Sequence, residues 1–321
     1  MGAAFSLAWP MTYLKTYGPR ANPITGLTWG LMDLSLAVIA IITVLVVAGV
    51  WVRRERRSRP VFADLLVGRE AGGLRWIWIG LGLTIVALVA SLAWTVAVMA
   101  AVGMPGGQPA LTLEITGHQW WWEVRYVGAT PNQTFVTANE IHVPTGRPVL
   151  VKLNGADVIH SFWIPALAGK TDAIPGRTNL TWLQADRAGV YRGQCTEYCG
   201  VQHANMAAFV TADPPAVFEA WRAGQLRASV PAASPGKQLF VQRCGACHTV
   251  RGGEAGGVVG PDLTHLMSRR TLAAGTVPNT PDGLSGWISN PQALKPGARM
   301  PATDLSGPEL GQVVAYLETL T

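Results

Sequence analysis

The sequence predicts a multidomain membrane protein with a two-helix transmembrane hairpin, then an all-β sandwich, then a small all-α domain. Three features predict this: two long apolar runs in the first hundred residues, short β-rich segments after them, and a Cys-x-x-Cys-His motif near the C-terminus. The 321 residues leave room for two or three domains. A hydrophobic fraction of 49% beside a charged fraction of 14%, with a mean hydropathy of +0.24, is also typical of a membrane protein.

The first domain is expected to comprise residues 1–103. Its two uncharged apolar runs predict membrane helices at about residues 31–52 and 76–102, because each run is long enough to cross a bilayer. The short apolar run at the start has no basic segment before it, so a signal peptide is not expected. A buried core helix explains each run less well, since an arginine-rich loop lies between the two.

Basic residues are concentrated in this first domain. Residues 1–103 contain nine Lys and Arg against four Asp and Glu, whereas residues 104–232 contain nine of each and residues 233–321 contain seven against six. The net charge of +6 is therefore a topology signal and does not predict nucleic-acid binding. The positive-inside rule predicts that the arginine-rich loop, residues 53–75, is cytoplasmic and that everything after residue 103 lies on the periplasmic or outer face.

The second domain is expected to comprise residues 104–227. Its segments rich in Val, Ile, Thr, Trp and Tyr lie at 110–117, 119–127, 140–142, 149–153, 179–184, 190–193 and 208–211. Their close spacing predicts a β-sandwich or barrel, followed by a helix at 217–227. A small-residue linker at 228–234 precedes the third domain, residues 235–321. The helices expected there at 237–242 and 308–320 could pack together through Gly236, Phe240 and Tyr316.

One loop between two late strands contains a set of soft and borderline ligands: Cys195, Glu197, Cys199, His203 and Met206. Thiolates, imidazole and thioether suit copper better than a hard cation. His160, at the end of a β-rich stretch, offers a second imidazole. Both cysteines could bridge a copper pair, with one histidine on each copper and with Met206 and the Glu197 backbone carbonyl as weak axial ligands. The alternative is a structural zinc site, which gives Met206 no role.

A second motif, C-x-x-C-H at residues 244–248, opens the third domain. It is the signature of covalent c-type haem attachment, in which Cys244 and Cys247 add to the haem vinyl groups and His248 ligates the iron. The alternative, a thioredoxin-like redox pair, requires a βαβ context that the sequence does not predict. The two motifs use all four cysteines, so no structural disulfide is expected.

The pattern C-x-E-x-C-G-x-x-H-x-x-M at residues 195–206 resembles the binuclear copper (CuA) loop of the cytochrome c oxidase subunit II family, and every motif position is matched. With the hairpin and the fused haem motif, the resemblance covers about residues 30–321. It implies a subunit II of the caa type. The second domain would then be a cupredoxin-like sandwich that binds CuA, and the third a class I cytochrome c domain that binds haem c.

The resemblance also implies roles for single residues. Met300, followed by Pro301, matches the methionine that supplies the sixth ligand to haem iron, and Met267 and His265 remain alternatives. Trp120 lies in the H-Q-W-W-W stretch of residues 118–122, and matches the position where electrons reach CuA. Strand alternation would place Trp120 and Trp122 on one face.

Further matched positions concern partners. The Glu197 carboxylate matches a ligand of magnesium at the interface with the catalytic subunit. Asp157, Asp172 and Arg177 match positions that face that subunit, although surface ion pairs are the alternative. His142 and His265 are expected to be structural.

The resulting hypothesis is an electron-transfer subunit of a respiratory cytochrome c oxidase in a bacterial plasma membrane. Electrons would pass from an external cytochrome c or similar donor to haem c, then to CuA, and then to catalytic subunit I. Further oxidase subunits and membrane lipid are expected partners, and nucleic acid is not. The apolar runs contain no histidine, so the oxygen-reducing site would be in another chain. Alternatives are a CuA subunit of a nitric oxide reductase and a stand-alone membrane-anchored electron carrier. The metal-free subunit II of a quinol oxidase conflicts with Cys195, Cys199 and Met206.

Overall fold

The computed structural model describes residues 11–55, 73–103, 105–229 and 233–321. The chain divides into two compact units: Pro23–Gly103 forms one, and the residues before and after it form the other. Most of the arginine-rich loop (residues 56–72) and the middle of the expected linker (residues 230–232) lie outside the described residues.

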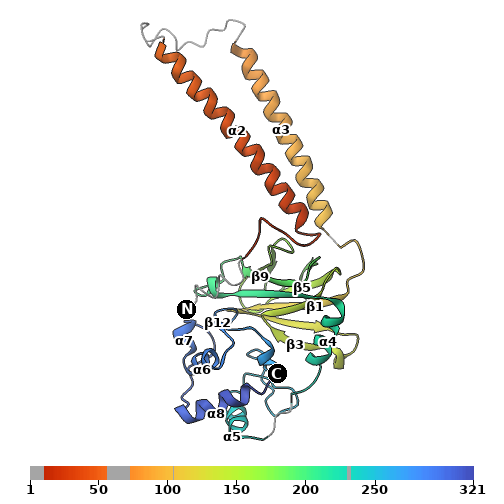
Figure 1. Ribbon diagram of the computed structural model, residues 1–321, viewed down its shortest axis with the longest axis vertical. Coiled ribbons are helices and arrows are strands. Elements are labelled where there is room, and N and C mark those ends of the chain that lie inside the picture. The colour runs from red at the N-terminus through yellow and green to blue at the C-terminus, as the bar shows by residue number, and fades with distance from the viewer. Residues whose placement is uncertain (1–10, 56–72, 104, 230–232) are drawn as a thin grey trace. The chain divides into compact units, whose positions relative to one another are not determined.

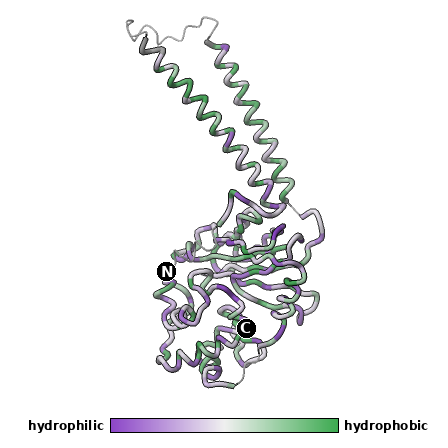
Figure 2. The backbone as a smooth tube through the Cα atoms, viewed as in Figure 1, coloured by the Kyte–Doolittle hydropathy of each residue, from purple (hydrophilic) through white to green (hydrophobic). Residues whose placement is uncertain are grey.

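The first unit is a pair of long helices, α2 (Asn22–Glu55) and α3 (Gly73–Val102) (Figure 1). Both are long and apolar enough to cross a membrane, and Figure 2 shows apolar residues along most of their length. Helix α2 begins before the expected residue 31. Pro23 opens it, because proline is tolerated in the first turn, where its missing N–H would have had no partner. Gly30 lies against the ring of Trp94, so a side chain there would collide with α3.

Residues 11–21, which the sequence analysis grouped with the hairpin, lie in the same compact unit as the sandwich. The Tyr17 backbone N–H donates to the Ala166 carbonyl at 2.7 Å, and the Tyr17 carbonyl accepts from the Asp186 N–H at 2.8 Å. The Tyr17 ring also packs on Tyr191, with 5.7 Å between centroids. Backbone contacts of this kind leave no pattern in the sequence, which is why hydropathy did not reveal them.

The second domain is a sandwich of two five-stranded sheets, ordered β3-β2-β1-β5-β8 and β4-β10-β9-β6-β7. The first sheet contains β1 (Leu111–His118), β2 (Trp121–Val127), β3 (Phe135–Ala138), β5 (Val149–Gly155) and β8 (Asn179–Leu183). The second contains β4 (Glu140–Pro144), β6 (His160–Trp163), β7 (Thr171–Ala173), β9 (Gly189–Cys195) and β10 (Ala207–Asp213). The expected strands are confirmed, while the short β3 and β7 were not anticipated.

Alternating burial holds the two sheets together. Leu113, Ile115, Trp122 and Val124 of the β1–β2 hairpin are fully buried, while their neighbours along each strand face outward. Each buried aliphatic side chain stabilises the fold by about 1.5–3 kcal/mol. Helix α4 (Pro215–Gln225) closes the domain and confirms the expected helix there.

The third domain contains α5 (Pro235–Arg243), α6 (Pro281–Ser289), α7 (Pro291–Leu294) and α8 (Gly307–Leu317), with a small β11–β12 ladder (Thr271–Leu272 and Val277–Pro278). The expected packing of the terminal helices is confirmed. Phe240 of α5 and Tyr316 of α8 pack with 5.3 Å between ring centroids, and a Cβ on Gly236 would collide with the α8 backbone. The sequence did not predict α6 or α7, whose helical patterns are short.

Candidate metal centre and haem site

The sheet that contains β6, β9 and β10 places the candidate copper ligands. Strand β6 pairs antiparallel with β9, with Phe162 opposite Cys195, so His160 at the start of β6 lies beside the end of β9. Cys195 is the last residue of β9 and Met206 immediately precedes β10, and the Cys195 N–H donates to the Met206 carbonyl at 3.0 Å. The two ends of the copper loop are therefore held together by the sheet itself.

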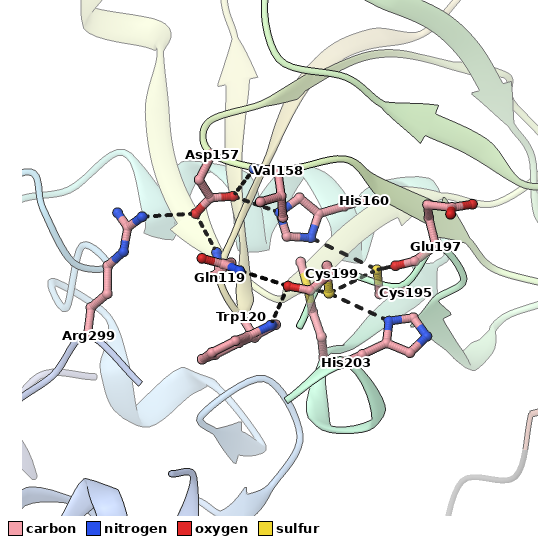
Figure 3. Close-up of polar contacts among 11 residues, drawn as sticks. Gln119, Trp120, Asp157, Val158, His160, Cys195, Glu197, Cys199, His203 and Arg299 are labelled. Carbon is pink, nitrogen blue, oxygen red and sulfur yellow. Dashed lines mark hydrogen bonds and ion pairs between the residues drawn. The ribbon is translucent and has the colours of Figure 1, made fainter. Parts of the chain in front are cut away.

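Within this loop the ligand atoms converge. The sulfurs of Cys195 and Cys199 lie 3.8 Å apart. The Nδ1 of His160 lies 4.0 Å from the Cys195 sulfur, and the Nδ1 of His203, in the short helix η2 (His203–Asn205), lies 3.5 Å from the Cys199 sulfur. Each sulfur thus has its own histidine (Figure 3).

Each sulfur also has its own weak donor. The Glu197 carbonyl oxygen lies 3.3 Å from the Cys195 sulfur, and the Met206 thioether lies 3.9 Å from the Cys199 sulfur. His160, Cys195, Cys199 and Met206 are all buried. The structure therefore brings together every ligand that the sequence proposed for the copper pair.

The two thiols form a hydrogen-bonded pair and no disulfide, since a disulfide requires an S–S separation near 2.05 Å. The contact with Cys199 lowers the pKa of Cys195 to about 4, and the same contact raises the pKa of Cys199. The contact therefore favours the thiolate form of Cys195. Because a thiolate is the form that ligates metals, the loop is prepared to bind one.

Asp157 orients His160 by a hydrogen bond to the ring nitrogen that faces away from Cys195. Its carboxylate accepts from His160 Nε2 at 2.9 Å, which fixes the tautomer and leaves Nδ1 directed at Cys195. Burial alone would lower the pKa of His160, but the hydrogen bonds to Cys195 and Asp157 outweigh it and raise that pKa.

A two-residue turn between β1 and β2 clamps the copper loop. Both Gln119 Nε2 and Trp120 Nε1 donate to the Cys199 carbonyl, at 2.8 and 3.0 Å. Trp120 and Trp122 are both buried, whereas Trp121 is half-buried and stacks on His118. Strand alternation does not explain this pattern, because Trp120 precedes β2. Trp120 lies in the turn and not on a strand, yet its indole still contacts the backbone of a copper-loop cysteine.

The chemistry of the donors fits a copper pair. Two imidazoles, a thioether and a carbonyl surround the pair of sulfurs, and the order of softness of these groups favours copper. A single tetrahedral zinc ion would use the four cysteine and histidine ligands and leave the buried Met206 thioether unused.

The haem motif lies at the end of α5. Cys244 caps the helix and is half-buried, which raises the pKa of its thiol to about 11, and Cys247 is exposed. His248 Nδ1 donates to the Pro261 carbonyl at 2.8 Å, so its other ring nitrogen is the one available to iron. A Cβ on Gly260 would lie 2.6 Å from His248 Cε1, so the glycine makes room for the imidazole. These residues fit a covalently attached haem.

Hydrogen bonding reduces the number of candidates for the sixth iron ligand. Both ring nitrogens of His265 are within hydrogen-bonding distance of carbonyl oxygens, those of Thr321 at 2.8 Å and Arg227 at 3.0 Å. His265 is therefore structural, as expected, and neither nitrogen is free for iron. Met267 and Met300 are both half-buried against the core of the third domain, so Met300 stays a prediction.

Comparison with known proteins agrees with this geometry. Residues 129–213 match the family described as cytochrome c oxidase subunit II, periplasmic domain, and residues 233–321 match the cytochrome c family. The chain is 34% identical to cytochrome c oxidase subunit 2 of Alkalihalophilus pseudofirmus, over 97% of this chain and 91% of that protein. The chain belongs to the cytochrome c oxidase subunit II family. It is also 27% identical to cytochrome c oxidase subunit 2 of Bacillus subtilis, over 84% of this chain and 80% of that protein.

Among solved structures, this subunit II is similar to the periplasmic domain of subunit II of cytochrome oxidase from Bradyrhizobium japonicum. That match has 35% identity and a TM-score of 0.35, and it covers 37% of this chain and 95% of the other. A haem-copper terminal oxidase dimer structure matches with 22% identity and a TM-score of 0.32, over 42% of this chain and 99% of the other.

The family matches confirm the predicted family, the predicted function, and CuA and haem c as cofactors. The two sheets and the helical third domain confirm the predicted fold class. This subunit II is a membrane-anchored electron-transfer subunit of a cytochrome c oxidase, with a cupredoxin-like CuA domain and a cytochrome c domain. It associates with other subunits of the oxidase complex, which catalyses the oxidoreductase reaction.

The structure also locates the residues matched to partners. Glu197 is exposed, so its carboxylate can reach a partner while its carbonyl faces Cys195. Asp172 and Arg177 line an open hollow on the surface. Asp157 instead contacts His160 and also Arg299 of the third domain, at 3.2 Å.

The sequence did not predict two further residues near the site. Lys295 and Arg299 of the third domain contact the β1–β2 turn and the copper-ligand support, respectively. No sequence signal marks them, since a lysine and an arginine in a loop are ordinary surface residues. Only proximity to Met300 could have drawn attention to Arg299.

Proposed function

We propose that haem c is held by Cys244, Cys247, His248 and Met300 of this subunit. CuA is held by the ligands that converge on the copper loop: His160, Cys195, Glu197 through its carbonyl, Cys199, His203 and Met206. A c-type haem and a binuclear copper centre each take up and release one electron at a time. The chain therefore links an external donor, such as a cytochrome c, to the catalytic subunit.

The observation that carries this proposal is the symmetry of the copper loop. Two cysteine sulfurs lie 3.8 Å apart, and each has one imidazole nitrogen and one weak donor beside it. Two equivalent sets of ligands around a shared pair of sulfurs match two metal ions better than one. Because the sheet and the Asp157 contact hold these groups, little would rearrange when the oxidation state changes.

Trp120 is proposed to be where electrons reach the copper centre. Its indole N–H donates to the Cys199 carbonyl, and its six-membered ring would lie 3.3 Å from a Cβ placed on Gly297 of the haem domain. Trp120 thus contacts both the copper loop and the segment that leads to Met300.

The charge distribution and the exposed residues support further proposals about membrane topology and partners. The arginine-rich loop is proposed to lie in the cytoplasm of a bacterium, with the copper and haem domains on the periplasmic or outer face of its inner membrane. The exposed Glu197 carboxylate is proposed to bind magnesium where this subunit meets catalytic subunit I. Asp172 and Arg177 would face that subunit.

Metal and optical analysis of the full chain, purified in detergent, tests the proposal. We expect two copper ions with a mixed-valence EPR signal and one covalent haem. Zinc in the cysteine loop, or haem that an organic solvent extracts, would contradict it.

The Met300→Ala variant tests the iron ligand. It should change the haem spectrum and leave the copper EPR signal intact, because Met300 lies in a separate domain from the copper ligands. Met267→Ala is the matched control. If only the Met267 variant alters the haem spectrum, Met267 is the ligand.

A further inference from the structure

Lys295 is a buried cation at the boundary between the haem domain and the copper domain. It directly follows α7 and is only 2% exposed. Its ammonium donates to three backbone carbonyls, those of Trp120 at 2.7 Å, Asn205 at 2.8 Å and Ala273 at 2.8 Å. Among the described residues, no carboxylate pairs with it.

Burying an ammonium without a counter-ion costs free energy of desolvation, whereas an apolar side chain would pack there without that cost. Burial lowers the pKa of Lys295 to about 7. An apolar side chain could not replace the three hydrogen bonds that the lysine donates, so these hydrogen bonds suggest the role of Lys295.

The three carbonyls belong to three parts of the proposed electron path: the Trp120 turn, the copper loop and the haem domain. Trp120 lies in the turn that clamps the Cys199 carbonyl, and Asn205 lies between the copper ligands His203 and Met206. Ala273 is in the haem domain. A single ammonium therefore joins the turn, the copper loop and the haem domain.

The segment after Lys295 continues the contact. The Pro296 carbonyl accepts from Gln202 Nε2 of the copper loop at 2.9 Å. A Cβ on Gly297 would lie 3.3 Å from Trp120 and 3.4 Å from Val201, so the backbone here packs directly on both. This segment leads to Met300, which places the proposed iron ligand close along the chain to the Trp120 contact.

We propose that Lys295 is a positioning residue for electron transfer, holding Trp120 and the copper loop against the segment that carries Met300. This rests on the proposed function, in which haem c donates to CuA past Trp120. The hydrogen bonds of the Lys295 ammonium reach no residue proposed to bind copper or haem, so Lys295 acts through the three carbonyls that it binds. The transfer moves one electron from ferrous haem to the oxidised copper pair, and no bond is formed or broken.

Docking of the two domains has a second, separate anchor. The buried Glu140 carboxylate of β4 accepts from the backbone N–H groups of Arg270 and Thr271, both at 2.9 Å, and from the Thr271 hydroxyl at 3.0 Å. Glu140 contacts neither Trp120 nor the copper loop in these hydrogen bonds. Variants at Lys295 and Glu140 can therefore separate the positioning of Trp120 from simple docking.

The test is the rate of haem-to-copper electron transfer in the full chain, after flash reduction of the haem by a photoexcited ruthenium complex. Lys295→Met should slow the transfer by about tenfold or more, because small misplacements of reacting groups have large rate effects. Copper EPR and the covalent haem spectrum confirm loading. Lys237→Met, the same change on α5 of the same domain, should leave the rate unchanged.

Glu140→Gln completes the design. A slow Lys295 variant beside a near-normal Glu140 variant supports the proposal. An unchanged rate in Lys295→Met overturns it, even if the haem domain melts earlier, because that is the pattern of a merely structural lysine. Equal slowing in both variants also overturns it and leaves Lys295 a docking contact.

Two further outcomes are possible: the Lys295 variant fails to incorporate haem, or the unsubstituted chain transfers no electron. If Lys295→Met does not incorporate haem, Lys295→Gln, which keeps two donors without the charge, takes its place, and an unchanged rate there overturns the proposal. If the unsubstituted chain, fully loaded, transfers no electron between haem and copper, the proposed function fails and this proposal with it. If the unsubstituted chain transfers electrons normally and the Lys295 variant does so at the same rate, the Lys295 proposal fails while the proposed function stands.

Discussion

The copper loop and the haem motif lie in one unit, but they are built in opposite ways. The proposed copper ligands come from separate segments, with His160 lying 35 residues before Cys195. The sheet buries His160, Cys195, Cys199 and Met206 almost completely. The haem-attaching residues are nearly contiguous, yet Cys247 is exposed and Cys244 is only half-buried. The fold therefore makes the copper site, whereas the haem motif is local in the chain and partly exposed, and we expect bound haem to add to the core of its domain.

Removing each cofactor should show this contrast most strongly. In Cys195→Ser/Cys199→Ser the sandwich should stay folded without copper, because its core of Leu113, Ile115 and Trp122 does not involve the metal. In Cys244→Ala/Cys247→Ala the haem domain should be strongly destabilised, since small domains are only marginally stable. Amide hydrogen exchange measures both. Protection in α5 and α8 should fall by about 100-fold, or about 2.8 kcal/mol, and retained protection would abolish the contrast.

The support behind His160 provides the next largest effect. Asp157→Asn should weaken copper binding by about 10–100-fold, because the amide orients the imidazole less firmly than the carboxylate does. Competitive titration with a copper chelator measures the affinity. Asp172→Asn, the same change on the surface of the same domain, should have no effect. If both variants bind copper normally, the sheet alone positions His160.

Each site also has a glycine that makes room for its histidine. A Cβ on Gly117 would lie 2.7 Å from His160 Cδ2, and one on Gly260 would lie 2.6 Å from His248 Cε1. Gly117→Ala should perturb only the copper EPR signal and Gly260→Ala only the haem spectrum, each at a cost of about 1–3 kcal/mol in unfolding free energy. Gly224→Ala in α4, where a Cβ meets nothing, is the control. A change at both cofactors from either variant would mean that the sites are not independent.

The smallest predicted effect is a pH dependence confined to the copper domain. Burial lowers the pKa of His142, although its hydrogen bond to Asp213 opposes this, as does nearby Glu140, while Arg270 reinforces it. Below the unfolded pKa of about 6.5, the unfolded chain binds the proton first, so stability falls as the pH falls towards the folded pKa.

His142→Gln should therefore flatten the acid limb of the thermal unfolding midpoint of the sandwich, measured from about pH 7.5 to pH 5. The haem domain serves as the internal reference, because its unfolding should not respond to this substitution. An unchanged acid limb would show that the titration of His142 does not contribute.

Both motifs were predictable because their information is local. The copper loop spans twelve positions and the haem motif five, and ligand chemistry fixes what each spacing can bind. The two apolar runs were also predictable, since length and hydropathy suffice to identify candidate membrane helices. Short elements such as β3, β7 and α7 were missed, because three or four residues carry too little periodicity to recognise.

The sequence by itself determined what this subunit binds: two cysteines, two histidines and a methionine for copper, and C-x-x-C-H for haem. Only the tertiary structure decided how the two sites meet. Lys295 contacts Trp120 across 175 residues of chain, and Arg299 contacts Asp157 across 142. Such contacts depend on how whole domains pack, and no local pattern encodes them. For that reason the copper loop could be recognised at sight, but its connection to the haem domain could not.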